Sequence, residues 1–130
     1  MLIEFQVANF GSFKDPISLN MQSSREQRFR DRVPRFERTY RMSVNPIAAI
    51  YGANASGKSN LLEALRMLRS MVLGTRSVDR QRDYVFMLDP DMRNEPTLFK
   101  LVFTVNDTMH SYFLAIRNGQ VIEEYLSTLT

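Results

Sequence analysis

An eight-residue loop constrains the fold of this chain more than any other feature of its sequence. Residues 52–59 read Gly-Ala-Asn-Ala-Ser-Gly-Lys-Ser and fit the pattern GxxxxGK[ST] without a mismatch. The apolar run at residues 47–51 precedes the loop and is typical of a strand buried on both faces. Apolar residues then recur at helical spacing from Lys58 to Val72, and Gly74 can end the helix. A strand, a glycine-rich loop and a helix in this order predict an α/β fold around a phosphate-binding turn, or P-loop.

The loop carries the residue types that nucleotide binding needs. Its glycines let successive N–H groups converge on phosphate oxygens, and the helix start adds free N–H groups and a positive dipole end. We expect Lys58 to be the catalytic cation that contacts the β- and γ-phosphates of ATP, and Ser59 to ligate Mg²⁺ between them. The predicted nucleotide-binding residues of this Walker A loop are Gly52, Ala53, Asn54, Ala55, Ser56, Gly57, Lys58, Ser59 and Asn60.

Other interpretations of the loop stay open at this point. The glycines could serve only a strand-to-helix turn with Lys58 in solvent, or the loop could bind nucleotide without turnover. A small nucleotide or metabolite kinase also begins with a P-loop. Such kinases usually place it within the first dozen or so residues, whereas here it starts at Gly52, after two predicted strands.

The sequence before and after this unit predicts further strands. Residues 2–10 alternate apolar and polar side chains, as a half-buried strand does, and residues 17–21 repeat the alternation as its hairpin partner. Residues 75–96 are polar and contain two prolines, which predicts a connection with one irregular turn.

Three more strands are predicted at residues 98–105, 109–117 and 120–126, with Asn118-Gly119 as a strong hairpin signal between the last two. We therefore expect an α/β P-loop lobe with a mixed sheet, one main helix and an antiparallel meander over residues 97–126.

Positive charge is concentrated between residues 22 and 41. This stretch holds seven arginines and three acidic residues, while the whole chain has a net charge of +3. Such a segment is typical of a solvated loop or of contact with nucleic acid or another acidic partner. The arginines that could make such a contact are Arg25, Arg28, Arg30, Arg32, Arg35 and Arg38.

The composition bears on the cellular compartment in which this protein works. The chain has no cysteine, which excludes a disulfide framework and a cysteine-based metal site. No apolar run approaches the roughly 20 residues that cross a bilayer, and the N-terminus has no basic leader. These features predict a cytoplasmic protein without contact to a membrane.

The string YGANASGKSNLLEAL at residues 51–65 is more informative than the loop alone. It resembles the phosphate loops of ATPase heads of the SMC and RecF-like group, and LIEFQVANFGSFK at residues 2–14 resembles the first strand and turn of these heads. Residues 86–89, 95–97 and 121–126 resemble bacterial AAA-family proteins related to the overcoming-lysogenization-defect (OLD) ATPases, many of which serve phage defence. The resemblance covers essentially the whole chain and is weak across the arginine-rich stretch.

The resemblance implies that residues 1–130 are the N-terminal lobe of an ABC-type head, with residues 22–41 as an arginine-rich loop. In such heads two copies form a dimer that sandwiches ATP. The turn after the first strand lies near the adenine, which would bring Ser12, Phe13 and Lys14 to the base. An aromatic residue there can equally belong to the core.

The chain lacks several motifs of a complete head of this kind. No signature helix, no strand ending in Asp-Glu and no switch histidine is present. Asp89, at the end of an apolar run, could be the magnesium-side carboxylate or part of a packed loop. We expect this chain to bind ATP and Mg²⁺ with little turnover. The alternative is an ATP-gated module, without hydrolysis, that controls dimerisation or docking of a nuclease or DNA.

The remaining candidate residues have simpler explanations. Glu123 and Glu124 are neighbours on a predicted strand and cannot both face one site. His110 is predicted at the surface, and Met67, Met71 and Met87 are predicted to fill gaps in the core.

Overall fold

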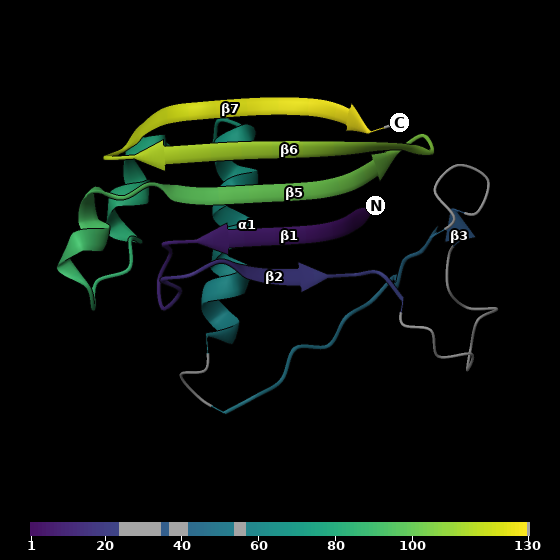
Figure 1. Cartoon of the computed structure of the whole chain (residues 1–130), viewed down its shortest axis with the longest axis horizontal. Helices are drawn as coiled ribbons and strands as arrows, with labels where there is room; N and C mark the ends of the chain where they lie inside the picture. The colour runs from purple at the N-terminus through teal and green to yellow at the C-terminus, as the bar shows by residue number, and fades with distance from the viewer. Residues whose placement is uncertain (24–34, 37–41, 54–56, 130) are drawn as a thin grey trace.

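A single antiparallel sheet with one long helix on its face forms the body of the molecule (Figure 1). The computed structural model describes residues 1–23, 42–53 and 57–129, together with the backbone of residues 35–36. The sheet has the strand order β2-β1-β5-β6-β7. Its strands are β1 (Leu2–Ala8), β2 (Ile17–Asn20), β5 (Thr97–Val105), β6 (Thr108–Arg117) and β7 (Gln120–Leu129).

The other elements lie around this sheet. The helix α1 (Lys58–Val72) crosses one face of the sheet (Figure 1). A small two-stranded ribbon, formed by β3 (Arg35–Phe36) and β4 (Met42–Ser43), lies beyond one end of the sheet, and two 3-10 helices lie at the other end (Figure 1). The 3-10 helices η2 (Val78–Asp83) and η3 (Pro90–Asn94) connect α1 to β5. Two 3-10 helices thus replace the one irregular turn predicted for residues 75–96.

Local turn chemistry sets the meander of β5, β6 and β7. Asn106 and Asp107 have φ of 48° and 60°, and Asn118 and Gly119 have φ of 51° and 73°. Two successive residues with positive φ form the turn whose twist matches that of paired strands, and Asn, Asp and Gly tolerate this conformation best. The three strands and the hairpin predicted at Asn118-Gly119 are confirmed.

The main core lies between α1 and the sheet. Val7, Phe99 and Leu114 are register neighbours on three adjacent strands, and each is at most 2% exposed. The helix covers this row with its apolar stripe. The buried residues of that stripe are Leu61, Ala64, Met67 and Leu68. Amphipathic spacing therefore predicted this helix correctly, because burying such a stripe is the main source of helix stability in proteins. The buried face was predicted only in part: Leu61 and Leu68 are buried, whereas Leu62 and Val72, which also belong to the predicted stripe, are 55% and 58% exposed.

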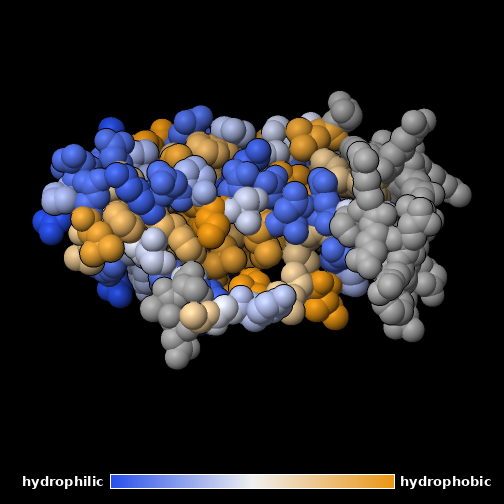
Figure 2. Space-filling model, turned by 60° about the horizontal axis from the view of Figure 1, so that its bottom comes forward, coloured by the Kyte–Doolittle hydropathy of each residue, from blue (hydrophilic) through white to orange (hydrophobic). Residues whose placement is uncertain are grey.

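The predicted buried strand at residues 47–51 is wrong for this chain. These residues form no regular element, and Ile47 and Tyr51 are 82% and 91% exposed. A run becomes a strand only by pairing with a neighbouring strand, and no described strand pairs with this one. Figure 2 views the molecule from the side on which the run lies, and apolar residues show on the body behind it.

The predicted mixed sheet is wrong for the same reason. All pairings among the described strands are antiparallel. The run at residues 47–51, predicted as a buried strand, does not join the sheet.

None of the helices in the described part of the chain has the length and apolar character needed to span a membrane.

Candidate nucleotide-binding site

The phosphate loop leads into α1 through a glycine with an unusual backbone conformation. Gly57 is the N-cap of the helix and has φ of 97°. No described side chain caps the first turn, which also contains no acidic residue. The first backbone N–H groups of a helix have no partner within it, and the dipole favours negative charge there. This helix start is therefore suited to an anion.

Lys58 folds back onto the first residues of the loop. Its ammonium donates hydrogen bonds to the carbonyl oxygens of Gly52 and Ala53, the latter over 3.1 Å. Both carbonyls belong to the first residues of the motif, so the lysine holds the two ends of the loop together. A nucleotide phosphate would have to take over these donors. The side chain of Ser59, next along the helix, is exposed.

The turn after β1 lies directly against the helix start. Phe10 and Phe13 exchange backbone hydrogen bonds of 2.8 and 2.9 Å, which closes the turn. Asn60 Nδ2 donates to Ser12 Oγ over 2.8 Å, and the ring of Phe13 lies next to Gly57. The structure thus brings Ser12 and Phe13 to the start of α1, with Phe13 half-buried against the main core. Whether they contact a base stays a prediction.

Gly11 is a residue of this turn that sequence analysis missed. It has φ of 57°, and a Cβ added there would come within 2.8 Å of Asn60 Cγ. The glycine itself was the available signal, but the local sequence does not show that a distant residue, Asn60, packs against it.

Lys14 has a carboxylate partner in the connection between α1 and β5. Its Nζ lies 2.6 Å from Asp89 Oδ2 in an exposed ion pair. Asp89 also caps η3 by accepting a hydrogen bond from the backbone N–H of Asp91. These contacts lower the pKa of Asp89, chiefly through the hydrogen bond from Lys14, and the same bond raises the pKa of Lys14. The structure thus places Asp89 in an exposed ion pair at the start of η3, and its role beside magnesium stays a prediction.

A buried polar network holds the turn at the end of β1. Asn9 is 1% exposed, and its Nδ2 donates to the carbonyls of Met92 and Glu95 over 3.0 and 2.9 Å. Thr97 Oγ1 donates to the Asn9 carbonyl and accepts a hydrogen bond from Gln81 Nε2. The other polar atom of that glutamine, Oε1, accepts from the Gly119 N–H. The network ties β1, the 3-10 helices and the last hairpin into one support for the turn.

The structure also locates the candidate residues that lie away from the phosphate loop. Glu124 accepts a hydrogen bond of 2.7 Å from the Tyr112 hydroxyl, while Glu123 is exposed. His110 is half-buried and stacks on a neighbouring ring of β5. Met67 is fully buried, as predicted, but Met87 is 67% exposed, so its predicted place in the core is wrong. Residues 84–88 form a loop that leaves Met87 outside the packed layers.

Some predicted residues lie outside the part of the chain that the structure describes. These are Asn54, Ala55 and Ser56 of the loop, Arg25, Arg28, Arg30, Arg32 and Arg38, and the side chain of Arg35.

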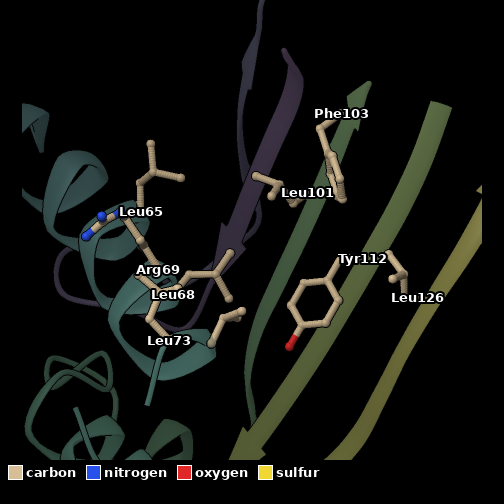
Figure 3. A pocket seen from close by; sticks show the side chains of 9 residues that line it. Leu65, Leu68, Arg69, Leu73, Leu101, Phe103, Tyr112 and Leu126 are labelled. Carbon is tan, nitrogen blue, oxygen red and sulfur yellow. The ribbon is translucent and has the colours of Figure 1, made fainter. Parts of the chain in front are cut away.

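An apolar groove of about 500 Å³ lies at the other end of α1 (Figure 3). Phe5, Leu101, Tyr112 and Leu126 are register neighbours on four strands, and the helix buries only the first of them. The groove runs between the uncovered strand residues and the last turns of α1, so it is separate from the phosphate loop. Burial, together with the nearby Glu124, raises the pKa of Tyr112.

An α/β scaffold with a GxxxxGK[ST] loop leading into its main helix defines a P-loop NTPase fragment. Comparison with protein families agrees with this class. The family described as "AAA domain, putative AbiEii toxin, Type IV TA system" matches residues 47–129. This is more than half of the chain, and the chain belongs to that family. Membership implies that the protein binds ATP. Comparison with curated proteins finds no match.

Proposed function

We propose that this chain binds ATP with Mg²⁺ through residues 52–60, as part of an ATPase head that resembles the SMC, RecF and OLD families. The observation that carries the proposal is the start of α1. It is uncapped by any described side chain, has no acidic residue in its first turn and follows a fitting phosphate loop. Lys58 supplies the cation for the β- and γ-phosphates, and its present carbonyl partners are weaker acceptors than phosphate oxygens.

Ser59 is the proposed magnesium ligand. Its hydroxyl stands on the first helical turn beside Lys58 and is exposed. Mg²⁺ is bound through few protein oxygens together with substrate phosphates, so a single hydroxyl fits the role. We expect Ser59→Ala to lower ATP affinity in Mg²⁺ to the value measured in EDTA. Ser70→Ala is the matched control, because the Ser70 hydroxyl donates to the Arg66 carbonyl in the same helix. Equal Mg²⁺ dependence in Ser59→Ala and the wild type would exclude this ligand.

The exposed run at residues 47–51 supports a larger head. Three of its apolar residues have substantial exposure, namely Ile47, Ile50 and Tyr51. Contiguous apolar surface of this kind usually marks an interface. We propose that another part of the head pairs with this run as a strand, and that two heads sandwich ATP. Hydrolysis would then need groups from that part and from the second copy, so this chain alone binds ATP with little turnover.

The pathway in which the parent protein works is proposed from the family description and from the resemblance. The family's description names a toxin of a type IV toxin–antitoxin system, and the resemblance to OLD ATPases points to phage defence or DNA processing. We therefore propose that the parent protein works in such a system.

A second candidate function is an ATP-gated module, without hydrolysis, that docks a nuclease or DNA. The seven arginines between residues 22 and 41 favour it. Contacts to DNA phosphates release counterions, so affinity would fall steeply with salt. Binding of duplex DNA with a steep salt slope that falls in Arg28→Ala/Arg30→Ala/Arg32→Ala would support the module. DNA binding equal in the variant and the wild type would argue against it.

A further inference from the structure

Two glycines from distant segments each face a side chain of the other segment. A Cβ at Gly57 would come within 2.7 Å of Phe13 Cε1 and 3.2 Å of Ser12 Oγ. A Cβ at Gly11 would come within 2.8 Å of Asn60 Cγ. Cβ atoms do not occupy such positions without displacing a neighbour, so the turn after β1 and the start of α1 interlock at these glycines.

A hydrogen bond joins the two interlocked segments, and a buried side chain supports the turn from behind. Asn60 Nδ2 donates to Ser12 Oγ over 2.8 Å. Behind the turn, the buried side chain of Asn9 donates to the carbonyls of Met92, Glu95 and Pro96 and accepts from the Phe86 N–H. The turn is therefore fixed to the sheet and to the 3-10 helices independently of the phosphate loop, and it can serve as a reference position for that loop.

We propose that Phe13 and Asn60 are positioning residues for phosphate binding. Phe13 holds Gly57, and Asn60 holds the first turn of α1, so that the N–H groups at the helix start point at the phosphates. In this proposal Phe13 acts through Gly57, because its ring edge lies against that glycine and the residue packs against the main core. Stacking of the ring face on a base is the competing role. The inference rests on the proposed binding of ATP.

Base stacking and loop positioning predict different ligand profiles. The test compares Mg²⁺-ATP with inorganic tripolyphosphate in Mg²⁺, which lacks the base, by calorimetry on the full chain. Phe13→Ala removes the ring, and Phe13→Leu keeps apolar volume in the core while losing the ring edge. We expect both variants to bind ATP and tripolyphosphate more weakly by the same factor, about tenfold, as when hydrogen bonds to a charged group are misaligned.

Phe113→Leu is the matched control, because Phe113 stacks on Tyr125 in the meander, away from the helix start. It should leave both affinities unchanged. Loss for ATP alone in the Phe13 variants would establish base stacking and overturn the proposal. Unchanged binding of both ligands would overturn it as well, as would a wild type that binds ATP but not tripolyphosphate.

Asn60 has its own test in case the Phe13 variants do not fold. Ser12→Ala and Asn60→Ala each remove one partner of the hydrogen bond, and each should weaken tripolyphosphate severalfold. The double variant should lose little more than either single variant, because the bond is broken once. Independent losses that multiply would overturn the role of this bond. A wild type that binds neither ligand, like Lys58→Ala, would instead refute the proposed function, and the positioning role with it.

Discussion

The ring of Phe13 occupies the space that a side chain at position 57 would need, with Cε1 2.7 Å from the place of a Cβ. Gly57→Ala must also hold φ of 97°, a conformation that costs a residue with a side chain about 1–2 kcal/mol. We expect this variant to lose stability in urea unfolding and to bind ATP at least about tenfold more weakly. Gly74→Ala is the control, since Gly74 has φ of 70° but nothing within 4 Å of its Cβ position. It should lose stability only, and an equal loss of ATP affinity in both would contradict the packing argument.

The polar network behind the turn predicts a stability effect at Gln81. This side chain is fully buried and joins Thr97 to the Gly119 N–H. Gln81→Leu keeps most of the volume but leaves a buried N–H without an acceptor, which costs about 1–3 kcal/mol. Urea unfolding of Gln81→Leu and of the exposed control Gln120→Leu measures the difference. Equal stability of the two variants would mean that the network contributes little.

The ion pair of Lys14 and Asp89 predicts a dependence on pH. The pKa of Asp89 is lowered from 3.8, so its contribution to stability is present above that value and is lost as pH falls through the lowered pKa. The pKa of Lys14 is raised from 10.5, so its contribution is present below that value and is lost as pH rises through the raised pKa. Lys14→Met should therefore melt slightly below the wild type at neutral pH, and the gap should close in strong acid and strong base. The gap is small because the pair is exposed. A gap that grows in acid would contradict the assignment.

Residues 47–51 are exposed, whereas Val44, a few residues earlier, is fully buried in a second small core. Tyr51→Ser should change the free energy of unfolding by less than about 0.5 kcal/mol. Val44→Ser should cost about 2 kcal/mol or more, because it removes buried apolar surface and buries a hydroxyl. A large loss in Tyr51→Ser, measured by urea unfolding, would show that the run is packed in this chain.

Local patterns in the sequence predicted most elements of the fold. Amphipathic spacing placed α1, alternation placed β1 and its partner β2, and Asn118-Gly119 placed the last hairpin. Each of these depends on residues close together in sequence, where periodicity and turn chemistry act directly.

The errors involve contacts between distant residues. An apolar run such as residues 47–51 becomes a strand only when other strands flank it, and the run itself does not show whether they are present. The same holds for Gly11, whose contact with Asn60 crosses much of the chain. In the candidate site, the motif predicted the loop and the helix start, whereas the interlock of the turn with Gly57 required the structure.

The most direct test of the central claim is calorimetry of Mg²⁺-ATP with the wild type, Lys58→Ala and Lys100→Ala, with phosphate release followed on the same samples. Lys100 lies on β5, so its variant removes the same charge away from the loop. We expect the wild type and Lys100→Ala to bind equally, Lys58→Ala to lose binding, and all three to release little phosphate. Equal binding by Lys58→Ala would contradict the nucleotide site at residues 52–60, and rapid phosphate release by the wild type would contradict the proposal that the catalytic groups lie elsewhere.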